Sequence, residues 1–290
     1  NFVSLAYPIL LKTFNTTFSL WLAQFFLSAL VLIIPTTLIG AIFPMVIKLY
    51  EEEKKQLDKS VGASYAFDTI GGALGVLIAI FLLIPALGFL RVAIIASFGN
   101  LLAGIIALSV KTKQEKKQKY SPHNISWKVL ILFFLSGSAA LMFQVIWTRF
   151  VMLIYGSGFY SFGIVLISFL LGLGLGSAFY SRWHLKFGNK IMGFIIVEFA
   201  IGIFGITLLK IFPLMEFFFL NIYFATNSYG LFLFLQTLIL FGVLLLPTFL
   251  MGMTLPILSS IVVNKNKAGE GVGKLFAVNS LGAIFGAFLA

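Results

Sequence analysis

The chain alternates long apolar runs with short segments that hold most of its charged residues. A helix rises 1.5 Å per residue, so about 20 apolar residues cover the ~30 Å of hydrocarbon in a bilayer. Runs of this length lie near residues 18–48, 61–85, 90–110, 128–154, 159–181, 190–212, 229–262 and 271–290. The pattern predicts an all-α fold, a polytopic bundle of about eight transmembrane helices.

Composition supports a lipid environment. Of the 290 residues, 60% are apolar and 10% are charged, against about 45–50% and about 25% in soluble domains. A soluble chain of this length could not bury that much apolar surface. These numbers exclude a secreted disulfide scaffold, a nucleic-acid module and an ordinary cytosolic enzyme. The absence of cysteine excludes a cysteine-based metal or redox site.

The net charge of +11 fits a membrane orientation signal better than a nucleic-acid partner. Sixteen of the twenty Lys and Arg residues lie in or beside alternate loops, at residues 49–60, 111–127, 182–189 and 263–270. Cytoplasmic loops of membrane proteins carry such an excess. We therefore expect these loops in the cytoplasm and the protein in the inner (plasma) membrane.

An internal repeat is the most specific signal in the sequence. Residues 35–44 recur as residues 247–256, and residues 61–75 recur as residues 272–286. The two copies follow one another in the same order and on the same predicted side of the membrane. This indicates a parallel repeat related by an axis along the membrane normal.

The repeat also predicts the domain organisation. The spans that begin near 128, 159 and 190 would have partners ahead of residue 1, so the chain is expected to be a fragment of two six-helix halves. Residues 1–110 would end the first half, residues 111–127 would form a Lys-rich cytoplasmic linker, and residues 128–290 would form the second half without its last helix. Two parallel six-helix repeats are the layout of major-facilitator transporters.

Prolines and glycines mark candidate structural sites. A proline inside a helix removes a hydrogen bond and kinks or breaks it, either as a hinge in a substrate path or as a simple packing kink. Glycine pairs four residues apart let helices approach closely. The prolines are Pro35, Pro44, Pro247 and Pro256, and the glycines are Gly71, Gly75, Gly172, Gly176, Gly282 and Gly286.

The Gly172–Gly176 run also imitates a nucleotide-binding loop, with Glu198 at the distance of a ribose ligand. The surrounding sequence does not fit a nucleotide-binding loop, because the glycines and the glutamate lie within apolar spans. We expect no cofactor in this chain.

Four polar residues inside spans form a candidate intramembrane site. Asp68 and Glu198 lie about 10 and 12 Å from the cytoplasmic edge at 1.5 Å per residue, and ionisable groups at such depth are functional candidates. They could line a path for a cation or a proton, or Asp68 could only brace its helix, as its neutral repeat counterpart Asn279 suggests. Gln144 can cross-link helices by hydrogen bonds. His123 and His184 lie in loops, and no metal site is expected.

Several segments resemble a known family. Residues 136–149 and 169–177, together with 40–44, 62–75 and 83–88, look like the membrane portion of fused major-facilitator/spermidine-synthase-like proteins of prokaryotes. The resemblance implies a soluble aminopropyltransferase-like domain after the helices, with a site for decarboxylated S-adenosylmethionine. This chain contains no such domain, so no catalytic residue is assigned and enzymatic activity stays open.

Two functions are therefore expected. The chain is the multi-pass membrane domain of a spermidine-synthase-like protein, or it is a stand-alone secondary transporter of a small solute, with cations among the candidates. The expected partners are the lipid bilayer, a polyamine or other small cation, and a soluble synthase domain downstream, with no nucleic acid.

Overall fold

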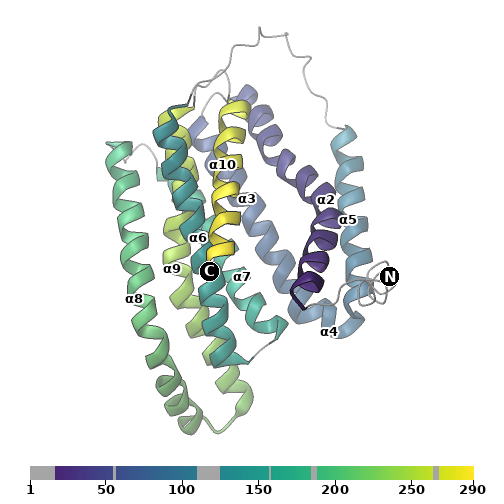
Figure 1. Cartoon of the computed structure of the whole chain (residues 1–290), viewed down its shortest axis with the longest axis vertical. Helices are drawn as coiled ribbons and strands as arrows, with labels where there is room; N and C mark the ends of the chain where they lie inside the picture. The colour runs from purple at the N-terminus through teal and green to yellow at the C-terminus, as the bar shows by residue number, and fades with distance from the viewer. Residues whose placement is uncertain (1–16, 55–56, 110–124, 157, 184–187, 264–267) are drawn as a thin grey trace. The chain divides into compact units, whose positions relative to one another are not determined.

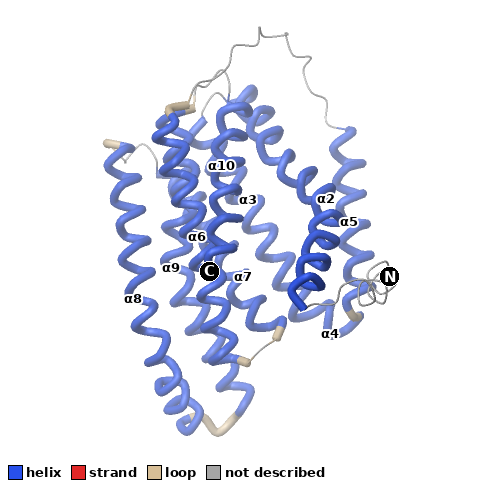
Figure 2. The backbone as a smooth tube through the Cα atoms, in the orientation of Figure 1, coloured by secondary structure: helices blue, strands red, loops and turns tan. Residues whose placement is uncertain are grey.

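The computed structural model describes residues 17–54, 57–109, 125–156, 158–183, 188–263 and 268–290. All regular structure in these ranges is helical (Figure 2). The long helices are α2 (Thr17–Lys54), α3 (Leu57–Ile78), α5 (Phe89–Ser109), α6 (Trp127–Tyr155), α7 (Phe159–Trp183), α8 (Lys190–Ala225), α9 (Tyr229–Val262) and α10 (Ala268–Leu289). The described chain has eight helices long and apolar enough to cross a membrane, which confirms the predicted all-α fold and its eight spans.

The second predicted span ends in an irregular turn. After α3 the chain forms a π-helical turn, η1 (Ala79–Leu83), and one further α-helical turn, α4 (Ile84–Leu87). Pro85 cannot donate a backbone hydrogen bond, and a wider turn accommodates this loss. Gly88 then adopts a positive φ of 79°, and its N–H donates to the Ile84 carbonyl at 2.9 Å. The whole segment still counts as one span, Ser60–Leu87.

Helix α8 is longer than the hydrophobic pattern predicted. It continues to Ala225 rather than ending near residue 212, with Pro213 inside it. The residues that follow this proline are almost all apolar or aromatic, so lipid and neighbouring helices can still bury them. The predicted end near residue 212 is therefore wrong.

Contacts within the chain separate it into two units, residues 1–45 and residues 46–290, and α2 runs through the boundary. In the second unit α7 is the central helix, with more than half of its span buried. Helix α7 packs against α9 and α3, α10 lies along α6, and α8 lies beside α9 (Figure 1). Helices from both sides of the expected linker therefore pack together; residues 110–124, most of that linker, lie outside the described ranges.

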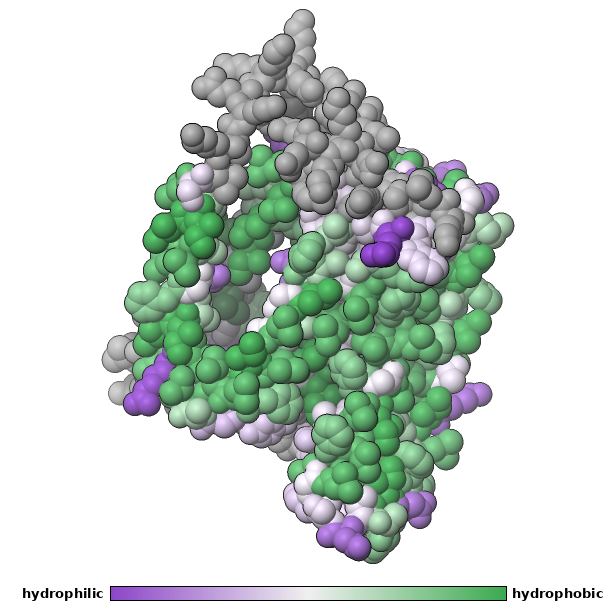
Figure 3. Space-filling view, turned by 180° about the vertical axis from the view of Figure 1, so that it is seen from behind, coloured by the Kyte–Doolittle hydropathy of each residue, from purple (hydrophilic) through white to green (hydrophobic). Residues whose placement is uncertain are grey.

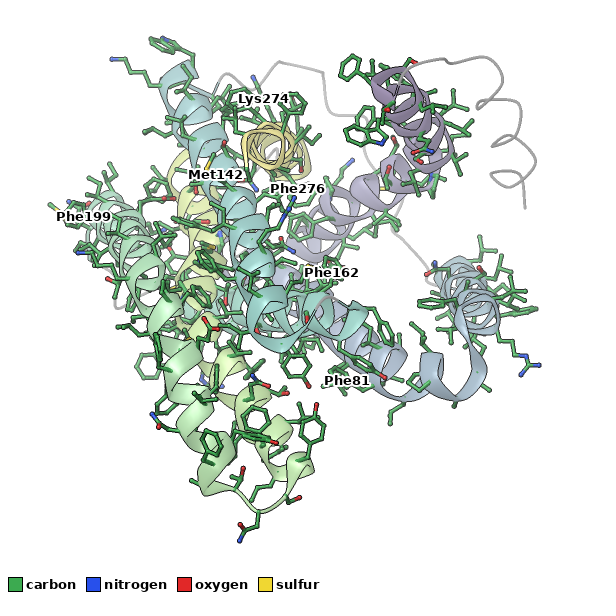
Figure 4. All side chains as sticks on the ribbon, turned by 60° about the horizontal axis from the view of Figure 1, so that its bottom comes forward. Phe81, Met142, Phe162, Phe199, Lys274 and Phe276 are labelled. Atoms are coloured by element: carbon green, nitrogen blue, oxygen red, sulfur yellow. The ribbon has the colours of Figure 1, made fainter. Side chains whose placement is uncertain are left out.

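The outer surface of the second unit is apolar. Phe199 of α8 is 72% exposed and points away from the other helices (Figure 4). The face in Figure 3 is mostly hydrophobic, with hydrophilic residues near its edges. Water would not cover such a surface favourably, whereas hydrocarbon does. The helices can sit in a lipid bilayer, and the chain has the character of a multi-pass membrane protein.

Candidate intramembrane site

Three glycines let α7 fit between two helices. Successive helical residues are turned by about 100°, so Gly172 and Gly176 share one face while Gly174 lies on the other. A Cβ at Gly172 would lie 2.6 Å from Thr248 Cβ, and one at Gly176 would overlap the Phe249 carbonyl, both on α9. A Cβ at Gly174 would lie 2.5 Å from Ile70 of α3. The run that imitates a nucleotide loop is placed here in a helix-packing surface.

The prolines of α9 lie within this packed surface. Pro247 and Pro256 are buried, and α9 continues through both. The Thr248 hydroxyl, directly after Pro247, lies 2.8 Å from the Leu244 carbonyl oxygen and 3.1 Å from that of Ser168 on α7. This hydroxyl can therefore donate a hydrogen bond to a carbonyl beside the proline or across the helix interface.

The prolines of α2 also lie inside one continuous helix. Helix α2 continues through both Pro35 and Pro44. None of the four prolines thus ends its helix, and the structure has no break at these positions.

The sequence repeat extends to side-chain hydrogen bonds. Thr36 follows Pro35 as Thr248 follows Pro247, and its hydroxyl donates to the Leu32 carbonyl at 2.7 Å. In the second block, the Thr69 hydroxyl donates to the Tyr65 carbonyl at 2.7 Å. The counterpart of that bond joins Ser280 to the Phe276 carbonyl at 2.9 Å. Equivalent residues therefore make equivalent local bonds in both copies.

Glu198 is tied to α6. The Ser136 hydroxyl donates to Glu198 Oε1 at 2.7 Å, which joins α6 to α8 at the predicted polar site. The carboxylate is half-buried, and it takes part in no ion pair among the residues whose placement is known. A hydroxyl donor stabilises the charged carboxylate without neutralising it.

Asn279 of α10 contacts α6 at Gly137, the residue that follows Ser136. A Cβ at Gly137 would lie 2.5 Å from Asn279 Oδ1, so only a glycine fits there. Glu198 and Asn279 therefore meet α6 at adjacent residues, from α8 and α10 respectively. Gln144 is half-buried on the same helix, about 12 Å further along at 1.5 Å per residue. Three of the four predicted polar residues thus lie on or against α6.

Asp68 stands apart from this group. It lies on α3, whose packed side is directed at α7, and its own side chain is exposed. Gly71 and Gly75 follow on the same side of α3, and no atom of the described part of the second unit lies within 4 Å of a Cβ at either position. Their repeat counterparts behave differently: a Cβ at Gly282 would overlap the Phe134 carbonyl, and one at Gly286 the Ser138 carbonyl.

Sequence reasoning missed several polar contacts between helices. Ser136 belongs to a segment used for the family resemblance, but nothing in its apolar context indicates a carboxylate partner. The Ser177 hydroxyl donates to the Gly62 carbonyl at 2.8 Å, and the Tyr180 and Ser260 hydroxyls lie 3.0 Å apart. Small and hydroxyl residues on the buried side of a span are the available signal.

No group of three metal-ligating side chains occurs within the described ranges. His123 and His184 lie outside those ranges. The polar groups around α6 are one carboxylate, hydroxyls and amides. Their oxygen atoms can accept hydrogen bonds from an ammonium group, and the carboxylate can take up a proton.

Comparisons with family models, curated proteins and solved structures find no match for this chain. The resemblance to fused spermidine-synthase-like proteins therefore stays a prediction from the sequence.

Proposed function

We propose that this chain is a transporter-type membrane domain that handles a small organic cation of the polyamine class. The observation that carries the proposal is Glu198, a half-buried carboxylate inside an apolar span with a hydroxyl donor and no ion pair among the described residues. A charge at the centre of a transmembrane helix costs about 2.5–3.5 kcal/mol on insertion scales. Such a cost favours a role in binding or conducting a cation.

The repeat supports the transporter type. Residues 35–44 and 61–75 and their copies share sequence and local hydrogen bonds. In transporters built from parallel repeats, substrate sites lie between the two halves near the middle of the membrane. In a major-facilitator layout of this chain, Asp68 would belong to one half, and Glu198, Gln144 and Asn279 to the other. The basic loops would face the cytoplasm from the inner membrane.

The resemblance supports the polyamine class. In a spermidine-synthase-like protein, the helices would anchor or supply a soluble aminopropyltransferase domain, and the intramembrane carboxylates would bind the amine substrate or product. In a stand-alone transporter, the same groups would carry the amine across the bilayer. Both forms require a carboxylate that binds an ammonium group inside the membrane.

Glu198→Gln tests this requirement. Uptake of labelled spermidine is measured in proteoliposomes that contain the complete protein. We expect a loss of at least tenfold, because the amide keeps the shape and the Ser136 contact but removes the charge. Asp68→Asn should also reduce uptake, and it introduces only the side-chain type found at the repeat position Asn279.

Glu216→Gln is the matched control. Glu216 lies on the same helix, 18 residues after Glu198, and is exposed. Eighteen residues make five helical turns, so the two carboxylates share a face of α8 about 27 Å apart. Uptake should be unchanged in this variant. Wild-type uptake by both Glu198→Gln and Asp68→Asn would refute the proposed cation site.

A further inference from the structure

Helices α6 and α8 meet at three positions that recur every seven residues. In each contact the α8 residue comes 62 positions after its α6 partner, so the two helices run in the same direction. Seven residues make almost two helical turns, which keeps successive contacts on one line along each helix. We call this line the α6–α8 seam, and its pairs are Ser136 with Glu198, Phe143 with Gly205, and Phe150 with Phe212.

Beyond Glu198, toward the C-terminal end of α8, aromatic rings fill the seam. A Cβ at Gly205 would overlap the Phe143 ring, so this ring occupies the space where α8 has no side chain. The rings of Phe150 and Phe212 then stack in parallel, with centroids 5.0 Å apart and an angle of 1° between their planes. Phe212 is 1% exposed. The two seam pairs beyond Glu198 therefore offer a cation no polar side chain.

The Phe143 ring is part of a larger packed group. It stacks on Trp147 with centroids 5.2 Å apart, and the fully buried Trp147 lies 5.5 Å from the ring of Phe169 on α7. A cation is attracted to the face of an aromatic ring, but Trp147 covers one face of Phe143, and the tip of the Phe143 ring is inserted at Gly205. This packing favours a barrier over a second cation site.

Glu198 lies close to one end of the seam. It follows Lys190, the first residue of α8, by eight residues, or about 12 Å. Phe212 lies fourteen residues, or about 21 Å, further along the helix in the other direction. An ion that moved along this second stretch would lose its water and gain no polar partner from the seam. Constrictions lined by apolar side chains stop ions in this way, by excluding water.

We infer that Phe143 and the Phe150–Phe212 pair form an aromatic barrier on one side of Glu198, so that a cation reaches this carboxylate only from the Lys190 end of α8. The inference rests on the proposed role of Glu198 as the cation site, and it adds the side from which that site is filled. With the basic loops in the cytoplasm, as the sequence predicts, the cation would enter from the cytoplasm.

Labelling of a single cysteine tests the side of access. The chain has no native cysteine, so Ser136→Cys places one thiol beside Glu198 in the complete protein. The membrane-impermeant cationic thiol reagent MTSET is added to sealed vesicles of each orientation. Gly188→Cys and Asn227→Cys, at exposed positions beyond the two ends of α8, identify the side that the reagent contacts.

The thiol at position 136 should react about tenfold faster from the Gly188 side than from the Asn227 side, because water is excluded from the ring-filled stretch. Equal rates, or a faster reaction from the Asn227 side, would overturn the inference. Absence of reaction from the Gly188 side would overturn it as well, because the predicted route to Glu198 would not exist.

Removal of the rings tests the barrier itself. In the single-cysteine protein, the added changes Phe143→Ala and Phe212→Ala should raise the labelling rate from the Asn227 side about tenfold. The matched control Phe134→Ala/Phe204→Ala removes one half-buried ring from each of the same helices, on sides turned away from the seam, and should leave the rate unchanged. An unchanged rate in the seam variant, or an equal rise in the control, would show that these rings are not the barrier.

The labelling rates require no substrate, so this test can fail separately from the uptake assay. Wild-type uptake by Glu198→Gln would count against the cation site, whereas the side of water access would still be measured. If the seam variant did not fold, the comparison of the two sides in the Ser136→Cys protein would decide the inference by itself.

Discussion

The close contact between α7 and α9 at Gly172 permits a quantitative prediction. Gly172→Ala adds one methyl group that would overlap the Thr248 hydroxyl and lie 2.6 Å from Thr248 Cβ and 2.9 Å from the Phe249 nitrogen. Ordinary contacts of this kind are 3.4–4 Å long, so the two helices must separate by roughly 1 Å. The Thr248 hydroxyl would then lose its contact with the Ser168 carbonyl.

Three contributions determine how much Gly172→Ala changes the free energy of unfolding. Overpacking in a well-packed interface costs about 1–3 kcal/mol. The hydrogen bond between helices contributes about 0.6 kcal/mol in a membrane. Replacing glycine by alanine inside a helix returns about 0.5–1 kcal/mol. We therefore expect a net destabilisation of about 0.6–3 kcal/mol, and a fall in Tm of roughly 1–12 °C at about 2–4 °C per kcal/mol.

Thermal unfolding in detergent, followed by tryptophan fluorescence, measures this change. Gly242→Ala on α9 is the matched control, because no atom in the described part of the chain lies within 4 Å of its added Cβ. It should raise the Tm by about 1–4 °C through helix propensity alone. A Tm that rises by the same amount in both variants would show that α7 and α9 do not approach closely at Gly172.

The remaining predictions concern fully buried polar groups. Among the described residues the Ser259 hydroxyl has no hydrogen-bond partner, so Ser259→Ala should raise the free energy of unfolding by about 1 kcal/mol. Ser177→Ala loses the bond to the Gly62 carbonyl and should lower that free energy by about 0.6 kcal/mol. Shifts of the same sign in urea unfolding would contradict these two predictions. The Trp147 ring stacks on Phe143 at 5.2 Å, and no described residue accepts a hydrogen bond from its Nε1. Trp147→Phe should therefore change the free energy of unfolding by less than about 1 kcal/mol, while Trp147→Ala should lower it by about 3–5 kcal/mol. Equal losses in the two Trp147 variants would assign a role to the nitrogen rather than to the ring.

Part of the candidate site was accessible from the sequence. The carboxylate of Glu198 was predictable because a charge inside an apolar span is rare and costly. The glycine pair at 172 and 176 was predictable as a packing motif from its spacing. The partners of these residues were not, since Ser136 and Thr248 look like many other hydroxyl residues within apolar helices.

The sequence by itself determined the eight spans. In hydrocarbon every backbone N–H and C=O must find its partner within the chain, so each long apolar run has to be a helix. The extension of α8 past Pro213 was not predicted, because no charged loop marks a boundary directly after that proline.

Only the tertiary structure decided which helices meet. Gly71 and Gly282 belong to matching motifs. A Cβ at Gly282 would overlap the α6 backbone, whereas a Cβ at Gly71 has no atom of the described residues 46–290 within 4 Å. Lipid is as apolar as the helix surfaces, so hydrophobicity cannot select a neighbour. The neighbour of a helix is selected by shape complementarity. The close contacts involve only a few atoms and depend on residues of both helices, so they cannot be read from one stretch of sequence.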